Sequence, residues 1–162
     1  MNDSRFTVDH VRLATDKPFE EVAKAFERQL GRFDPDVYEY LAANGDAERA
    51  KAKIEAMVGT SGFMLFRTTD HGTLLSILGE KKKAIQYILG NPLIAIQMTR
   101  HNLAAGLYAP LRVLVYRDDR GRTCLEYDKP SSLFGQFNDD RITSVASTLD
   151  RKLEDLIAKA IE

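Results

Sequence analysis

The sequence predicts an α+β domain, and two patterns in it carry this prediction. Short segments with apolar side chains at alternate positions, such as Leu111–Arg117, are separated by turn residues and indicate antiparallel strands. The end of the chain, from Asp139 or Asp140 onward, repeats apolar residues at helical spacing and predicts a long amphipathic helix. With 162 residues, of which 44% are hydrophobic and 29% charged, residues 1–162 have the size and composition of one globular domain.

The first sixty residues predict one strand followed by helices. Phe6–Ala14 reads as a strand in which the phase of the apolar residues shifts near His10. Phe19–Leu30 has apolar residues at helical spacing, and Gly31 is a plausible end for this helix. Residues 34–59 predict a short helical turn through Leu41 and then a helix over Asp46–Val58. Because their apolar stripe is weak, we interpret them as a helical insertion that packs at the periphery, with a lid as the alternative.

The middle of the chain predicts an antiparallel meander and a helix. The expected strands are Gly62–Thr69, Thr73–Leu78 and Ala84–Leu89. Asn91 is then expected to cap a helix that begins with Pro92 and runs to about Asn102. Residues 103–110 and 130–138 are expected to be loops.

The strands Leu111–Arg117 and Thr123–Tyr127 are expected to form a hairpin whose register depends on its turn. A two-residue turn would place Glu126 on the apolar face of Val113 and Val115. A left-handed Gly121 shifts the pairing by one residue, and Val113 and Val115 then share a face with Leu125 and Tyr127. Burial favours this second register. It leaves a mixed set on the opposite face, namely Arg112, Leu114, Tyr116, Cys124 and Glu126.

The final helix has the clearest apolar stripe in the chain. Leu149, Leu153 and Leu156 lie at the centre of this stripe. We therefore expect these three side chains to be deeply buried against the sheet.

Two segments resemble a known family. Tyr87–Pro92 is a strand that enters Gly-Asn-Pro and a helix. Gly106–Tyr116 contains Pro-Leu-Arg-Val-Leu-Val-Tyr and precedes an acidic turn and a strand that ends in Tyr127–Pro130. In these features the chain resembles the bacterial and archaeal family catalogued as domain of unknown function 302, over about residues 62–162 and the first strand and helix. Residues 34–59 look longer than the family's usual connection.

The resemblance implies a two-layer fold like that of the TATA-binding protein. In such a fold, helices, including a long C-terminal one, cover one face of a curved antiparallel sheet. The resemblance implies neither DNA binding nor an activity, because a fold does not determine a function.

Charge and motifs exclude several classes of protein. The formal net charge is −1, and Lys81–Lys83 is the densest basic run, so we expect no nucleic-acid or membrane partner. A lysine run is typical of a solvated strand edge.

Cys124 is the only cysteine, residues 1–5 lack the apolar core of a leader, and no run is long enough to span a bilayer. These features predict a cytoplasmic protein. No phosphate loop, dinucleotide fingerprint or metal spacing is present, so we expect no cofactor and no metal.

Several strands are apolar on both faces, and this pattern indicates a binding surface. Helices on one side would leave the second face of the sheet too apolar for water. A ligand, a second copy of the chain or residues 34–59 must therefore cover it. The candidate ligand-binding residues are Arg112, Leu114, Tyr116 and Glu126, with Asn91 as a separate anion site at a helix N-terminus. The structural alternative for Arg112 and Glu126 is a surface ion pair.

No specific activity follows from these residues. The favoured function is a non-enzymatic domain that binds a small apolar or anionic molecule, or forms a homodimer, through the second face of its sheet. The alternative is an enzyme that acts on a small, partly apolar substrate, with Arg112, Tyr116 and Glu126 as its polar groups.

Overall fold

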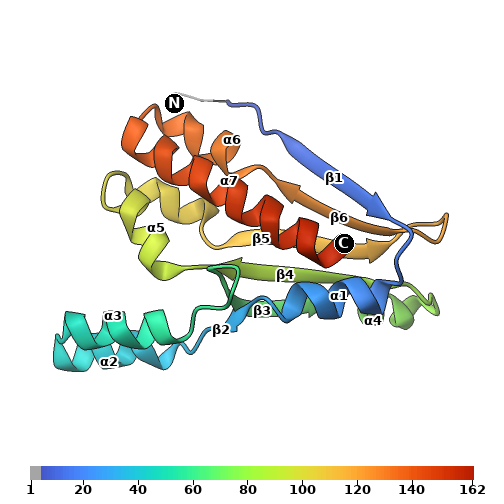
Figure 1. The fold of residues 1–162 in the computed structure, drawn as a ribbon, viewed down its shortest axis with the longest axis horizontal. Coiled ribbons are helices and arrows are strands. Elements are labelled where there is room, and N and C mark those ends of the chain that lie inside the picture. Colours follow the sequence, from blue (N-terminus) through green and yellow to red (C-terminus); the bar gives the residue numbers. More distant parts are fainter. Residues whose placement is uncertain (1–4) are drawn as a thin grey trace.

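Six strands form one open, curved sheet in the computed structural model, which describes residues 5–162 (Figure 1). The strands are β1 (His10–Thr15), β2 (Gly31–Arg32), β3 (Met64–Asp70), β4 (Ala84–Gly90), β5 (Leu111–Arg117) and β6 (Thr123–Asp128). Their order across the sheet is β1-β6-β5-β4-β3-β2, and each neighbouring pair is antiparallel except β2 with β3. The α+β class is confirmed, and the arrangement is compatible with a TATA-binding-protein-like fold.

The N-terminal part of the chain differs from its prediction in two details. The first strand begins at His10, so Phe6–Asp9 do not belong to it. The short strand β2, which pairs in parallel with β3, has no signal in the sequence because it contains only Gly31 and Arg32. Residues 1–4, which belong to the segment considered for a leader, lie outside the described residues.

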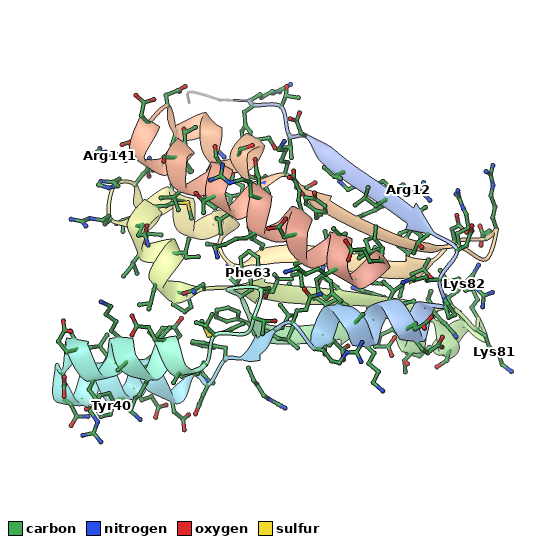
Figure 2. All side chains as sticks on the ribbon, viewed as in Figure 1. Arg12, Tyr40, Phe63, Lys81, Lys82 and Arg141 are labelled. Atoms are coloured by element: carbon green, nitrogen blue, oxygen red, sulfur yellow. The ribbon has the colours of Figure 1, made fainter. Side chains whose placement is uncertain are left out.

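Two amphipathic helices, one short and one long, lie together on one face of the sheet (Figure 1). They are α1 (Phe19–Glu27) and α7 (Asp140–Ile161). Their apolar stripes form the main core with the inward side chains of the strands, and Figure 2 shows Phe63 within this layer. Leu149, Leu153 and Leu156 are buried, as predicted. Asp139 accepts a hydrogen bond from the backbone of Arg141 and caps α7.

The β5–β6 hairpin has the register that burial favoured. Gly121 has φ of +81°, which is the left-handed conformation that the bulged turn requires. Val113 pairs with Tyr127 and Val115 with Leu125. These four side chains are buried under the helices, whereas Glu126 faces the opposite side of the sheet.

The predicted strand at Thr73–Leu78 is wrong. This segment forms a short helix, α4 (His71–Leu75), and a 3-10 turn, η1 (Ser76–Leu78). The Asp70 carboxylate accepts a hydrogen bond of 2.8 Å from the backbone N–H of Thr73, and this cap favours a helix over an extended chain. The expected meander is therefore a pair, β3 and β4. The lysine run after η1 leads into β4, an interior strand, so it does not protect a sheet edge.

The helix after Gly90 begins as predicted but ends earlier. α5 (Pro92–Thr99) has Asn91 as its N-cap, whose side chain accepts a 2.9 Å hydrogen bond from the backbone of Leu93. The two expected loops contain helical turns, namely η2 (Leu103–Tyr108), α6 (Pro130–Phe134) and η3 (Gly135–Phe137).

Residues 34–59 form a helical hairpin that covers part of the second sheet face. It consists of α2 (Asp36–Asn44) and α3 (Ala47–Ala56), and Figure 1 shows it extending from one end of the sheet. Met64 is fully buried against Val37, Ala50 and Ile54 from the hairpin. Of the three covers considered for the apolar face, this segment therefore accounts for the end of β3.

The hairpin leaves and rejoins the sheet at one crossing point. The backbone N–H groups of Gly31 and Gly59 both donate to the carbonyl oxygen of Phe63, each at 3.0 Å. A Cβ atom on Gly31 would collide with the carbonyl oxygen of Met57, and one on Gly59 would collide with the backbone nitrogen of Gly31. Only glycine permits this close approach of two backbones.

Candidate functional site

The second face of the sheet is polar on β1, β6 and β5, where no helix covers it. The pairing places Arg12 beside Glu126, Glu126 beside Leu114, and Leu114 beside Gln86. Since paired residues share a face of the sheet, these side chains form one row across four strands. The next row contains Ala14, Cys124, Tyr116 and Ala84.

Glu126 is the centre of a polar network on this face. Its carboxylate accepts hydrogen bonds from Tyr116 Oη at 2.5 Å and from His10 Nε2 at 3.1 Å, and it forms an ion pair of 3.1 Å with Arg12 Nε. His10 Nδ1 lies 2.9 Å from Asp128 Oδ1. Figure 2 shows Arg12 on β1, at the edge of the sheet. The predicted ion pair between Arg112 and Glu126 is therefore wrong, because the antiparallel edge strand β1 supplies Arg12 instead.

The network favours one charge state for each of its titratable groups. The hydrogen bond from Tyr116 lowers the pKa of Glu126, which keeps this carboxylate ionised. Burial, and next the bond to Glu126, raises the pKa of Tyr116 far above its usual value, which keeps the phenol neutral. Hydrogen bonds to Asp128 and Glu126 raise the pKa of His10 and favour its charged form.

A hollow of about 280 Å³ lies beside this network. Its lining residues are His10, Gln86, Arg112, Val113, Leu114, Glu126, Tyr127 and Asp128. Arg112 is exposed at its rim, and its side chain forms no hydrogen bond, ion pair or ring contact with any residue in the range 5–162. The structure thus brings Arg112, Leu114 and Glu126 to one hollow and binds Tyr116 to Glu126.

Asn91 lies away from this hollow. Besides accepting the bond from Leu93, its side chain donates to the carbonyl oxygen of Gly62 at 3.1 Å. It lines a small, mostly apolar cavity of about 90 Å³ with Pro92, Ile94 and Met98 among others. Both ends of its amide are occupied, so its position is explained by the strand-to-helix junction.

The sequence reasoning missed His10, Arg12, Gln86 and Asp128. His10 and Arg12 are two polar side chains at alternate positions of a strand, which is the pattern of one solvated face. That pattern was a usable signal, but their partners depend on β1 lying next to β6, more than a hundred residues away. Cys124 is fully buried on this face, with its thiol 3.7 Å from Arg12 Nη2. Cys124 is therefore a buried packing residue of this face.

The described part of the chain contains no cluster of three or more histidine, cysteine, aspartate or glutamate side chains placed to hold a metal ion. None of its helices has the length and apolar character needed to cross a bilayer.

Comparison with known proteins finds one family and one fold. Residues 39–160 match the family model described as Domain of unknown function DUF302. A crystal structure of an uncharacterized conserved DUF302 protein from Bacillus stearothermophilus is similar, with a TM-score of 0.65 and 18% sequence identity. The match covers 93% of this chain and 97% of that one, and at this identity it shows the fold alone. No curated protein matches the sequence.

Proposed function

The chain belongs to the DUF302 family, and within that family's fold we propose that it binds a small molecule in the hollow on its second sheet face. The ligand carries an anionic group, held by Arg112, and an apolar part that lies against Leu114. The observation that carries the proposal is the state of Arg112. Its guanidinium has no partner among residues 5–162, while His10, Glu126 and Asp128 beside it are hydrogen-bonded.

The composition of the hollow supports a small, partly apolar ligand. Leu114 provides apolar surface in the same row as the Gln86 amide and the Glu126 carboxylate. Few polar groups on an apolar wall are typical of sites that orient a small molecule. A guanidinium offers five N–H donors in a fixed fork, which suits a carboxylate or a phosphate.

The pKa values of Tyr116 and Glu126 argue against acid–base catalysis by these two groups. A general acid or base works best with a pKa near the working pH. The pKa values of Tyr116 and Glu126 both move away from neutral pH, since that of the phenol is raised and that of the carboxylate is lowered. We therefore place a binding domain before the enzyme that uses Arg112, Tyr116 and Glu126.

A ligand also fits this face better than a second copy of the chain. In a homodimer closed over it, Arg112 would be buried, and burial of an unpaired charge is costly. The acidic groups of the hollow already contact His10 or Arg12. Sedimentation at high micromolar concentration measures the oligomeric state, and a dimer that Arg112→Glu dissociates would replace the ligand proposal with self-association.

The test uses native mass spectrometry of the protein as purified from cells. We expect a bound small molecule on the unchanged protein and on an Arg67→Gln variant. Arg67 is the matched control, because it is an exposed arginine on β3 that also lacks a partner among the described residues and does not line the hollow. Arg112→Gln should lose the bound molecule. Equal occupancy in both variants, or no bound molecule in any of the three proteins, contradicts the proposal.

A further inference from the structure

Two opposite charges lie side by side at the hollow without touching. Val113 of β5 pairs with Tyr127 of β6. Because the strands are antiparallel, Arg112, which precedes Val113, lies opposite Asp128, which follows Tyr127. Both line the hollow of about 280 Å³, and both also line a smaller one of about 30 Å³. No ion pair joins them, although their positions on adjacent strands are roughly 5 Å apart.

Each of the two side chains has unused hydrogen-bonding capacity. The Arg112 guanidinium has all its donors free with respect to the described residues. Asp128 uses Oδ1 for His10, and within residues 5–162 its second oxygen, Oδ2, accepts no hydrogen bond. The Asp128 side chain is 37% exposed, so a ligand can reach it.

The hollow is poorly suited to a simple anion. Glu126 and Asp128 both line it, and the Asp128 carboxylate lies at the strand position next to Arg112. A carboxylate bound to Arg112 would be repelled by the Asp128 carboxylate beside it, because like charges at this range disfavour one another. A ligand that brings its own positive group next to the anionic group removes this repulsion.

We propose that the ligand is a zwitterion of the α-amino acid type, whose carboxylate binds Arg112 and whose ammonium group binds Asp128 Oδ2. The ligand's side chain lies against Leu114 and Gln86, so apolar or amide side chains fit this wall. The inference rests on the proposed function, since it names the ligand class for the same hollow. It requires Arg112 and Asp128 to be adjacent but not paired with each other, with the guanidinium and Asp128 Oδ2 open to a ligand, and that is the arrangement observed.

The experiment compares three probes of matched shape on the full chain. L-Leucine has both charged groups, 4-methylpentanoate lacks the ammonium group, and 3-methylbutylamine lacks the carboxylate. Titration followed by backbone amide shifts of Arg112, Leu114 and Asp128 gives a dissociation constant for each probe. We expect leucine to bind about ten-fold or more tightly than either analogue, which is the usual effect of losing a charged hydrogen bond.

Two substitutions separate the two contacts. Asp128→Asn should weaken leucine and leave 4-methylpentanoate equal or stronger, because the repulsion is removed. Arg112→Gln should weaken both probes. The matched controls are Asp155→Asn and Arg67→Gln, which alter exposed residues outside the hollow.

The outcomes distinguish this inference from the function on which it rests. Equal binding of leucine and 4-methylpentanoate, both weakened by Arg112→Gln, overturns the zwitterion and keeps the Arg112 site. No shift at the hollow with any probe overturns the zwitterion, while a bound molecule in native mass spectrometry would still support a site of another ligand class. Leucine binding that Asp128→Asn does not change also overturns the ammonium contact.

Discussion

Replacing Leu153 by alanine should destabilise the fold strongly, because this side chain lies between α7 and the sheet with 1% of its surface exposed. Burial of a leucine side chain contributes about 1.5–3 kcal/mol. The cavity left behind adds to this loss, so Leu→Ala changes in a core cost about 2–5 kcal/mol. For a chain of this length each kcal/mol corresponds to about 2–4 °C in Tm, and the expected shift is about 4–20 °C.

The assay is urea unfolding followed by far-ultraviolet circular dichroism, since the chain has no tryptophan. The matched control is Leu103→Ala, which removes the same atoms from a side chain that is 86% exposed. The control should change the unfolding free energy by less than about 0.5 kcal/mol. The reasoning fails if Leu153→Ala costs no more than the control with an unchanged m-value, because the apolar stripe of α7 would then not be core.

Two further predictions concern the glycine crossing and the polar network. Gly59→Ala should cost about 1–3 kcal/mol, the usual penalty of overpacking, because its Cβ meets the backbone of Gly31. Gly135→Ala is its control, since nothing lies near that position and its φ of −60° suits alanine; equal unfolding free energies for the two variants would refute the crossing. The raised pKa of His10 means that its contribution to stability is present below its usual pKa of 6.5 and is lost as pH rises through the folded-state value. The stability difference between the protein and His10→Gln should therefore shrink above neutral pH, and a difference that stays constant from pH 5 to 9 contradicts the network.

The sequence predicted what depends on short-range chemistry. The turn at Gly121 and the burial of Val113 and Val115 together selected one of two registers, and the structure has that register. Asn91 and Pro92 likewise mark a helix start that needs only neighbouring atoms. The segment Thr73–Leu78 was assigned wrongly because its apolar run suits a strand or a helix, and the Asp70 cap decided the outcome.

The candidate site was only partly predictable, for a different reason. Arg112, Leu114 and Glu126 lie on one hairpin, so alternation along the strand was enough to place them on one face. His10, Arg12 and Asp128 join them only because β1 pairs with β6 at the sheet edge, a contact between distant segments that has no local signal. Hence Glu126 was given the wrong arginine as its partner, and the free state of Arg112 was not foreseen.

The crossing at Gly31 and Gly59 has a consequence for how this fold tolerates change. Because the chain returns to the point from which it left, the hairpin α2–α3 is a side branch that β2 and β3 do not need for their own connection. Lengthening or shortening the turn of this hairpin changes the entropic cost of loop closure only slightly. The turn residue Gly45 is exposed. The cost of removing the branch is local, since it uncovers Met64 and the partly buried Phe66. The hairpin tip at Gly45 is therefore a suitable place to insert a foreign segment or a reporter. The hairpin adjoins β2 and β3, whereas the residues that line the hollow belong to β1, β4, β5 and β6.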